Sequence, residues 1–459
     1  MQESPSGPWS WRSASAGAAY VFREDGSSWR PDAKLLASDA ADGFGGAVAV
    51  SGNVAMVTGG GGAYAFRHDA STWLEEAKLR PGGGGGPRAT SVALWGDVAV
   101  LAAPEATDQG TDSGAAYVFR YDGTIWREEA KNLASHGKPY DCFGRSVAVS
   151  DGLVIVEASG DGSAGDRLGA AYVYRFDGAQ WVEEAILVPS DSRMGDRFGT
   201  AVATAGDVVL VGAPYEDGRP PDDPGRAYVY RYDGSRWVEQ AKLFDPAGHP
   251  GDEFGESVAL SPDLAVIGAR LADDRGDSSG AAYVYRFDGS AWVPGPKLLA
   301  SGGLYFDALG ASVALSGPVA LVGAPSGVAM NVQPNPSTAY VYDLARTPAP
   351  SVSIEDAVVT EESAVGQWMS FRVSLSGPQP GWTSVWYSTQ DGSANAIADY
   401  WPSYELLLFP PGTTTRRAWI WVRGDAVPET PEYFFITLAA PWGLAVGDKY
   451  GIGVIVDDD

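Results

Sequence analysis

Among the residue types that could do chemistry in this sequence, the carboxylates of the C-terminal quarter are the most suggestive. They gather at the ends of strand-like segments: Glu361, Asp399, Asp425, Glu429, Glu432, Asp457, Asp458 and Asp459. Ca²⁺ takes about six to eight oxygen ligands in irregular geometry, so carboxylates brought together would suit it. Carboxylates that stay apart are ordinarily solvated turn residues. The residue types alone leave both interpretations open.

Residues that commonly carry catalysis are sparse. The three histidines, His68, His136 and His249, lie far apart in the sequence, and Cys142 is the one cysteine. The run GGGGG at 82–86 lacks the Gly-Lys-Ser/Thr ending of a phosphate-binding loop. The metalloprotease pattern H-E-x-x-H is also missing from the sequence. We therefore expect a non-catalytic protein.

The composition excludes several classes of partner. Acidic residues outnumber basic ones 58 to 32, and the formal net charge of the 459 residues is −26. Such a surface repels nucleic acid and anionic lipid and attracts cations. No apolar run is long enough to span a membrane, and the start MQESPSGPWSWRS lacks the features of a secretion signal. Because the repeat described next starts in mid-phase, we expect the chain to be part of a larger multidomain protein.

An internal repeat supplies most of the elements that must position any site. The stretch GAAYVYRFDGSAWV at 280–293 recurs with small changes at 17–30, 114–127 and 169–182. Its tyrosine returns about every 55 residues, at Tyr20, Tyr64, Tyr117, Tyr172, Tyr228, Tyr283 and Tyr340. A tryptophan follows the first six of these tyrosines at one fixed offset, at Trp29, Trp73, Trp126, Trp181, Trp237 and Trp292. A fixed offset kept six times indicates one structural unit repeated.

Each repeat predicts a small antiparallel sheet. Within 254–298 the segments ESVALS, LAVIGA, AAYVYRF and AWVPGPKLL read as four strands. The last two flank Asp288-Gly289, whose glycine can adopt positive φ and close a tight hairpin. One such sheet cannot bury both of its faces, so neighbouring sheets must pack around a ring. We predict an all-β fold that begins with a β-propeller, most readily of seven blades. Because the first unit has only its last two strands and the last unit lacks its fourth, six blades are the alternative.

Two short motifs give the repeat a family resemblance. Phe-Gly precedes the first strand of several units, and Gly-Ala-Pro follows the second strand at 212–214 and 323–325. These units resemble FG-GAP repeats, which are similar to the propeller of integrin α chains, and the resemblance covers about 15–346. Departures include Arg88-Ala89 in place of Phe-Gly and Leu309 in place of the last phenylalanine. The resemblance implies a propeller that presents its loops to a partner. The acidic loops 215–225 and 271–280 lack the D-x-D-x-D-G spacing of integrin calcium loops, which leaves Ca²⁺ in the propeller uncertain.

A second domain follows the repeats. The sequence predicts a propeller over 1–346, a stiff proline-containing linker over 347–351 and a second domain over 352–459. The longer alternating segments WMSFRVSL, TSVWYST, RAWIWVRG and YFFITLA predict an immunoglobulin-like β-sandwich for this domain.

This second domain resembles a Calx-β domain over nearly its whole length, from STQDGSANAIADY to VIVDDD. In that family a cluster of Ca²⁺ ions lies at one end of the sandwich. Carried over residue by residue, the resemblance implies these Ca²⁺ ligands: Glu361, Asp399, Asp425, Glu429, Glu432, Asp457 and Asp458. The acidic run of the family is here Gly424-Asp425-Ala426, so we expect fewer ions or weaker affinity than in relatives with more carboxylates.

Together these features predict a non-catalytic binding or cell-adhesion module. The resemblances imply an extracellular or membrane-associated protein of the cell surface, of bacterial type, that takes part in adhesion or cell communication. Its partner would be a protein or a glycan at the propeller, and Ca²⁺ would bind the C-terminal domain. A passive spacer within a larger surface protein is the alternative. A carbohydrate-active propeller enzyme is a weaker one, because two carboxylates could meet at the central channel.

Overall fold

The computed structural model describes most of the chain. The described residues are 17–26, 28–39, 41–83, 87–158, 160, 169–191, 197–215, 225–245, 248–274, 276–300, 305–325, 337–345, 351–361, 366–377, 383–410, 412–424, 428–442 and 445–457. The chain divides into two compact units, Met1–Asp343 and Leu344–Asp459. Residues 347–350 of the expected linker lie outside the described residues, and Ser351 already belongs to a strand.

The N-terminal unit is built from small antiparallel sheets whose strands follow one another in chain order. In the described part these are a two-stranded sheet, five four-stranded sheets and a three-stranded sheet. Sheet by sheet, the strands are β1 (Ala19–Glu24), β2 (Trp29–Leu35); β3 (Val48–Ser51), β4 (Val54–Gly59), β5 (Gly62–His68), β6 (Trp73–Leu79); β7 (Ser91–Trp95), β8 (Val98–Ala103), β9 (Ala115–Tyr121), β10 (Trp126–Asn132); β11 (Val147–Ser150), β12 (Leu153–Ala158), β13 (Ala170–Phe176), β14 (Trp181–Leu187); β15 (Val202–Ala205), β16 (Val208–Ala213), β17 (Arg226–Tyr232), β18 (Trp237–Leu243); β19 (Phe254–Ser261), β20 (Leu264–Ala269), β21 (Ala281–Phe287), β22 (Trp292–Leu298); β23 (Ser312–Ser316), β24 (Val319–Ala324) and β25 (Thr338–Asp343). A 3-10 turn, η1 (Pro81–Gly83), is the one helical element of the described residues.

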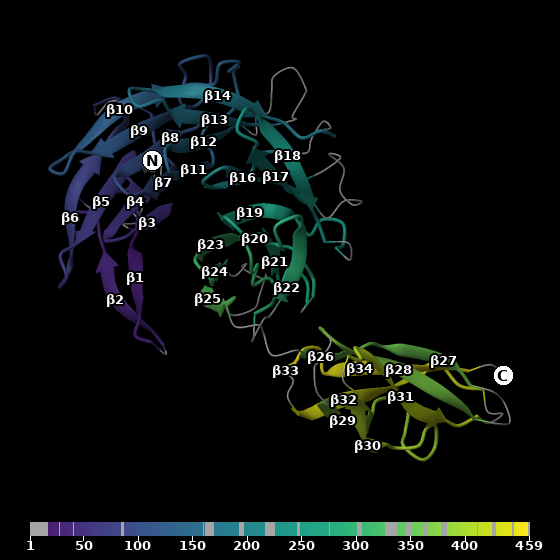
Figure 1. The fold of residues 1–459 in the computed structure, drawn as a ribbon. Coiled ribbons are helices and arrows are strands. Elements are labelled where there is room, and N and C mark those ends of the chain that lie inside the picture. The colour runs from purple at the N-terminus through teal and green to yellow at the C-terminus, as the bar shows by residue number, and fades with distance from the viewer. Residues whose placement is uncertain are drawn as a thin grey trace, which may run out of the picture. The chain divides into compact units, whose positions relative to one another are not determined.

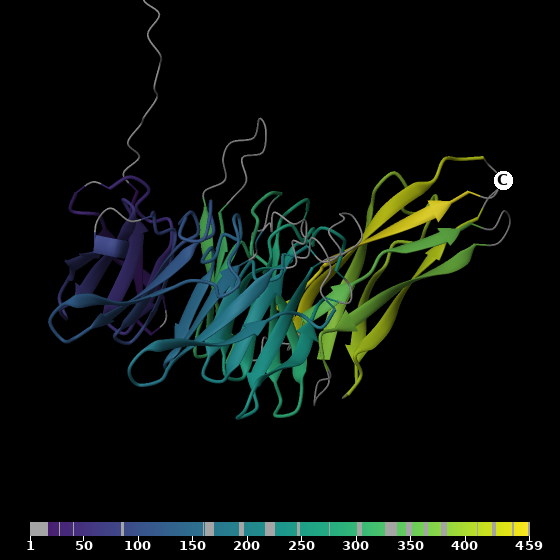
Figure 2. The same cartoon turned by 90° about the horizontal axis from the view of Figure 1, so that it is seen from above.

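Consecutive sheets of this unit lie side by side in a curved array, from the purple β1–β2 to the green β23–β25 (Figure 1). The same order of sheets is seen from above (Figure 2). Each of the seven repeated tyrosines falls on a different sheet, and the incomplete first and last units are as predicted. The middle strands β8, β12, β16 and β20 are buried along their whole length, because a sheet covers each of their faces. The array of four-stranded sheets is thus the predicted β-propeller architecture.

The Phe-Gly motif packs the start of each sheet that carries it. Phe143 and Phe198 are fully buried, and each lies edge-on to a repeated tyrosine, with ring centroids 5.4 Å from Tyr172 and 5.5 Å from Tyr228 respectively. The glycine that follows Phe198, Gly199, has φ of +102°, and a Cβ there would approach the carbonyl oxygen of Ala170 to 3.0 Å. Positive φ and close backbone approach together explain why glycine follows the phenylalanine.

The repeated tryptophan joins each sheet to the one before it. Trp237 donates its indole Nε1–H to Glu184 at 2.9 Å, and Glu184 also accepts from Arg175 on its own sheet at 2.8 Å. The Arg175 guanidinium lies over the ring of Tyr232, beside Trp237. The same tryptophan-to-acceptor bond occurs four more times, for Trp73 with Asp32, Trp126 with Glu76, Trp181 with Glu129 and Trp292 with Gln240. This contact between sheets explains the fixed Tyr–Trp offset of the repeat.

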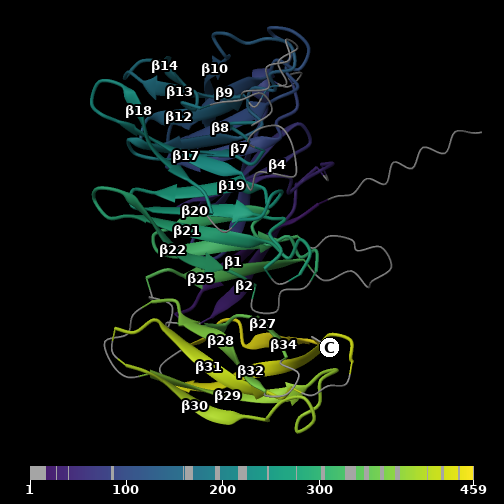
Figure 3. The same ribbon diagram turned by 90° about the vertical axis from the view of Figure 1, so that its right-hand side faces the viewer.

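The C-terminal unit is a sandwich of two sheets, drawn in green to yellow in Figure 3. One sheet has the order β31-β28-β26-β33 and the other the order β27-β34-β32-β29-β30. Their strands are β26 (Ser351–Ile354), β27 (Ala357–Thr360), β28 (Gln367–Leu375), β29 (Thr383–Asp391), β30 (Tyr404–Phe409), β31 (Thr415–Val422), β32 (Glu432–Trp442), β33 (Ala445–Val446) and β34 (Tyr450–Val456). Alternate residues such as Phe371, Val385 and Phe434 are fully buried between the sheets. The predicted immunoglobulin-like sandwich is therefore confirmed.

Candidate metal centre at one end of the sandwich

The sheet topology brings several chain segments to one end of the C-terminal sandwich. Strand β27 runs parallel to β34, with Thr360 opposite Val456, so Glu361 and Asp457 follow neighbouring strand ends. Strand β32 runs antiparallel to β34, so its first residue, Glu432, starts at the same end opposite Ile455. Carboxylates that are distant in the sequence are therefore near one another in the fold.

A loop between β29 and β30 adds Asp399 to this end. Its backbone carbonyl accepts from the Arg423 N–H at 2.9 Å, which ties the loop to the segment that follows β31. Its carboxylate accepts from the Asn395 N–H at 2.6 Å. Backbone N–H groups of Asn395 and Arg423 thus hold this aspartate in place.

Three of the predicted ligands converge. One carboxylate oxygen from each of Asp399, Glu429 and Glu432 lies within 4.8 Å of the other two. Asp457 lies beside them, since its Oδ2 accepts from the Glu429 N–H at 2.6 Å. Glu361 is buried, and its N–H donates to the Val456 carbonyl at 2.9 Å. The other two predicted ligands, Asp425 and Asp458, lie outside the described residues.

The electrostatics of the group favour a cation. Burial and the neighbouring Asp399, Glu429 and Glu361 raise the pKa of Glu432 to about 7. Such a rise means that the ionised carboxylates repel one another when no cation is present. A hard cation with oxygen ligands, such as Ca²⁺, would remove that repulsion and accept the irregular geometry. The donor set of this end of the sandwich therefore fits Ca²⁺.

A supporting aspartate was not among the predicted residues. Asp391, at the end of β29, accepts from the Ala396 N–H at 2.8 Å and from the Tyr400 hydroxyl. These bonds lower the pKa of Asp391, the tyrosine bond most. Tyr400 itself is fully buried and stacks on Phe434 with ring centroids 4.3 Å apart. Asp391 and Tyr400 thus fix the loop that carries Asp399, and the Asp-Tyr pair at 399–400 is the sequence signal for that anchor.

Two carboxylates of the acidic propeller loops have partners within the protein. Loop 215–225 lies mostly outside the described residues. In loop 271–280, Asp273 accepts from the Ser278 N–H at 2.7 Å, and Asp274 pairs with Lys297 at 2.5 Å. These contacts stabilise the loop without a cation.

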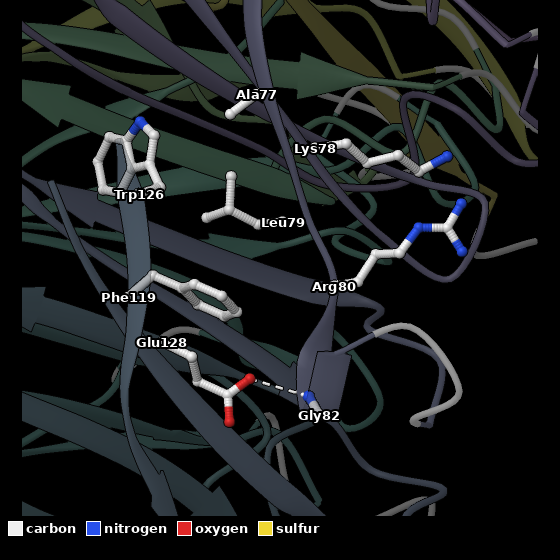
Figure 4. Close-up of a pocket in the computed structure, with 8 residues that line it drawn as sticks. All are labelled: Ala77, Lys78, Leu79, Arg80, Gly82, Phe119, Trp126 and Glu128. Atoms are coloured by element: carbon white, nitrogen blue, oxygen red, sulfur yellow. Dashed lines mark hydrogen bonds between the residues drawn. The ribbon is translucent and has the colours of Figure 1, made fainter. Parts of the chain in front are cut away.

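A cavity of about 550 Å³ lies between the second and third sheets of the propeller (Figure 4). Its lining residues are Ala77, Lys78, Leu79, Arg80, Gly82, Phe119, Trp126 and Glu128. At the next seam, between the third and fourth sheets, the Tyr174 hydroxyl donates to the Leu133 carbonyl, and the Ser135 hydroxyl donates to Glu183. At the cavity, Phe119 has no hydroxyl and Gly82 has no side chain, and Glu128 accepts from the Gly82 N–H at 2.9 Å. The cavity follows from these two changes to the repeat.

Two protein-family models match the chain. The FG-GAP repeat model matches 73–119, 126–174, 181–230, 237–285 and 292–342. Each match begins at the tryptophan of one sheet and ends in the third strand of the next. The Calx-beta domain model matches 346–454.

Curated relatives match the C-terminal domain type. Sodium/calcium exchanger 2 of Rattus norvegicus is 41% identical over 66 residues, 14% of this chain and 7% of the exchanger. The sodium/calcium exchanger Calx of Drosophila melanogaster is 39% identical over 93 residues, 19% of this chain and 10% of the exchanger. The chain thus spans at most a tenth of these relatives' length. The solved structure of the apo-form Calx CBD1 domain is 32% identical and covers 24% of this chain and 98% of that one, with a TM-score of 0.22.

Among the residues that the structure describes, none forms a helix long and apolar enough to cross a membrane.

Proposed function

Because this chain belongs to the FG-GAP repeat family and carries a C-terminal Calx-β domain, we propose that it is a non-catalytic extracellular binding or adhesion module. Its C-terminal domain binds Ca²⁺, and its propeller presents loops to a protein or glycan partner at the cell surface. The bound Ca²⁺ stiffens one end of the sandwich, because it neutralises carboxylates that otherwise repel one another.

The observation that carries the calcium proposal is the convergence of Asp399, Glu429 and Glu432 within 4.8 Å. Its support is chemical, since all the side-chain donors are carboxylates and the pKa of Glu432 is raised to about 7. We expect an affinity toward ~10⁻⁴–10⁻³ M, the range of extracellular calcium modules, because the acidic run of the family is shortened here.

Isothermal titration of the full chain with Ca²⁺ tests this proposal. The variants Asp399→Asn and Glu432→Gln each remove one charge from the group, and we expect each to weaken Ca²⁺ binding about tenfold or more. Glu355→Gln is the matched control, since Glu355 is an exposed acid of the same domain that pairs with Arg372. Absence of Ca²⁺ uptake at millimolar concentrations, or equal effects of all three variants, would contradict the assignment.

Exposed aromatic residues support the partner-binding role of the propeller. The loops that lead from the last strand of one sheet to the first strand of the next carry Tyr140 and the pair Tyr305-Phe306, all exposed. Tyr140 has φ of +70° and Phe306 has φ of +64°, a conformation that bulky residues rarely adopt. Strain of this kind is concentrated at functional loops. Each loop is tied to the preceding sheet, since the Tyr140 N–H donates to Thr111 and the Phe306 N–H to Asp277.

An array of extracellular-matrix proteins and cell-surface glycans tests the propeller role. We expect the full chain to bind a limited set of array members and the Tyr140→Ser/Phe306→Ser variant to lose them. Ile125→Ser, at an exposed apolar residue of a hairpin turn, is the control. Binding that survives the double variant would place the partner surface elsewhere. Protease accessibility on intact cells tests the extracellular location.

A further inference from the structure

The outer face of the sheet β31-β28-β26-β33 has a composition that its fold does not require. Along β28 the inward residues Met369, Phe371 and Val373 are buried in the core, while the outward residues between them face solvent. The outer face of an antiparallel sheet that covers a core on one side is ordinarily polar. Here tryptophan and arginine occupy much of it.

Three tryptophans form one end of this face. Trp368 on β28 stands opposite Trp421 on β31, with ring centroids 5.1 Å apart. Trp419 stands opposite Ser370 on the next outward row. Trp368 is 56% exposed and Trp419 is 47% exposed. A group of exposed tryptophans on a flat sheet marks an interaction surface, because their large apolar rings gain free energy when a partner covers them.

Two arginines occupy the following row. Arg372 on β28 stands directly opposite Arg417 on β31. Like charges in this position destabilise a sheet. Arg417 donates to the neutral Ser370 hydroxyl at 2.6 Å, and Arg372 has only a long contact of 3.9 Å with Glu355, both side chains being more than half exposed. The pair is therefore little compensated within the described residues, and an anionic ligand would relieve its repulsion.

The charge of this face is opposite to that of the chain as a whole, which carries 58 acidic and 32 basic residues. An exposed pair of arginines on a protein that is acidic overall provides a local positive charge, which complements a negatively charged partner. Guanidinium groups bind carboxylate and sulfate oxygens through paired hydrogen bonds. The adjoining tryptophans require that the same partner also present flat apolar surfaces.

We propose that this tryptophan–arginine face, defined by Trp368, Trp419, Trp421, Arg372 and Arg417, binds an anionic polysaccharide. Sugar rings stack their C–H faces on the indoles, and their acidic groups pair with the two arginines. The outward residues Ser370 and Ser374, the latter opposite Thr415, supply hydroxyls for the sugar and interrupt the apolar area. That interruption favours a glycan over a protein interface, whose centre is more continuously apolar. The inference goes beyond the proposed function, because it concerns a different surface from the calcium site and the propeller loops.

Affinity electrophoresis and calorimetry of the full chain test this proposal, with and without Ca²⁺. The probes are hyaluronan, whose charge is carboxylate, heparin, which adds sulfate, and neutral dextran. We expect binding to one or both anionic polymers, quenching of tryptophan emission, weakening with salt and no binding of dextran. Comparison of hyaluronan with heparin distinguishes the carboxylate from the sulfate.

Matched variants locate the surface. We expect Trp419→Ala and Arg417→Gln each to weaken binding about tenfold. Arg416→Gln is the control for charge, because the neighbouring Arg416 donates instead to the Leu408 carbonyl of the other sheet. Trp386→Ala is the control for a tryptophan, on the outer face of the opposite sheet, where it stacks on Tyr404. Both controls should bind within about twofold of the parent.

Several results would overturn the proposal. They are equal losses in Arg417→Gln and Arg416→Gln, equal binding of dextran, or unchanged binding in Trp419→Ala with a native thermal melt. Binding to vesicles of anionic phospholipid in place of either polysaccharide would assign the face to a membrane. Self-association that Trp419→Ala abolishes, without glycan binding, would assign it to a second copy of the chain.

Discussion

In six hairpins of the propeller the turn contains an aspartate followed by a residue with positive φ. That residue is glycine in five of the hairpins and alanine in the sixth. In the other five the second residue is Gly26, Gly123, Gly178, Gly234 or Gly289, with φ between +92° and +101°. In the hairpin between β5 and β6 it is Ala70, with φ of +76°. A Cβ in this conformation crowds the backbone, whereas glycine adopts it freely.

We predict that Ala70→Gly stabilises the protein by about 0.5–1 kcal/mol, because it removes this strain. Chemical denaturation followed by tryptophan fluorescence measures the gain. Gly123→Ala, the reverse change in the equivalent hairpin, should destabilise by a similar amount. A loss of stability in Ala70→Gly would mean that the greater freedom of glycine in the unfolded chain outweighs the strain.

The aspartates of these hairpins should stabilise the folded state by an amount that is lost in acid. Asp122 accepts from the Thr124 and Ile125 N–H groups and pairs with Arg127, and these contacts lower its pKa to about 2 from 3.8. Asp69 and Asp233 are lowered to about 2 in the same way. The folded state thus favours the ionised form, so the contribution is present above pH 3.8 and is lost as the pH falls toward 2.

Denaturation curves of the parent and of Asp122→Asn between pH 5 and pH 2 check this sign. The parent should be the more stable protein at pH 5, and the difference should shrink toward pH 2 as Asp122 takes up a proton. A difference that stays constant over this range would show that the carboxylate charge of Asp122 contributes nothing.

The individual residues that could be predicted from the sequence are those that lie in the repeat or in a motif of the family. Asp399, Glu429 and Glu432 could be named because each sits in a motif, and the structure brings these three together. Asp391 could not, because its role depends on hydrogen bonds from Tyr400 and Ala396 that only the folded loop creates. The cross-strand pair of Arg372 and Arg417 depends on strand register, which their separate positions in the sequence do not reveal.

Neighbouring sheets of the propeller are connected by a carboxylate that accepts hydrogen bonds from both sheets. Glu184 accepts from Arg175 on its own sheet and from Trp237 on the next. At the seam between β18 and β22 a glutamine, Gln240, takes the same place and still accepts from Trp292 at 3.1 Å. The bond between the sheets therefore requires an acceptor oxygen at this position but does not require a full negative charge.

We predict that Glu184→Ala destabilises the propeller by about 1–2 kcal/mol, because it leaves two donors without this acceptor in a partly buried seam. Glu184→Gln should cost less, since it keeps the acceptor. Trp237→Phe removes only the indole donor, and its coupling with Glu184→Ala in a double-mutant cycle should be about 1 kcal/mol. Additive effects of the two changes would mean that the bond between the sheets adds no stability.

The elements themselves were predictable because their signals are local. The four strands expected within 254–298 are β19 to β22, and the Asp288-Gly289 hairpin joins the last two. The partner of each tryptophan was not predictable, since it lies on the preceding repeat about 50 residues away and is reached only when the sheets pack. The cavity beside Phe119 has the same origin, because it arises from a missing hydroxyl and a missing side chain at a seam.

For the molecule as a whole, the division into two compact units predicts that Ca²⁺ acts on only one of them. Each unit has its own core, so calorimetry of the full chain should resolve two transitions. A ligand that binds only the folded form stabilises it by about 1.4 kcal/mol at ten times its dissociation constant. In a domain of this size that corresponds to a rise of about 5 °C in midpoint.

We therefore expect Ca²⁺ to raise the midpoint of the sandwich and to leave that of the propeller unchanged, relative to EDTA. Asp399→Asn and Glu432→Gln should each reduce the rise to about a third or less, because a site bound tenfold more weakly is stabilised by about 0.4 kcal/mol at the same Ca²⁺ concentration. Ala70→Gly should move only the propeller transition and so identifies it. Equal shifts of both transitions would mean that Ca²⁺ also binds the propeller, whose described acidic loop already pairs Asp274 with Lys297. No shift of either would mean that the carboxylates at the sandwich end are too few to hold the ion, and the role of a passive spacer would then account better for this chain.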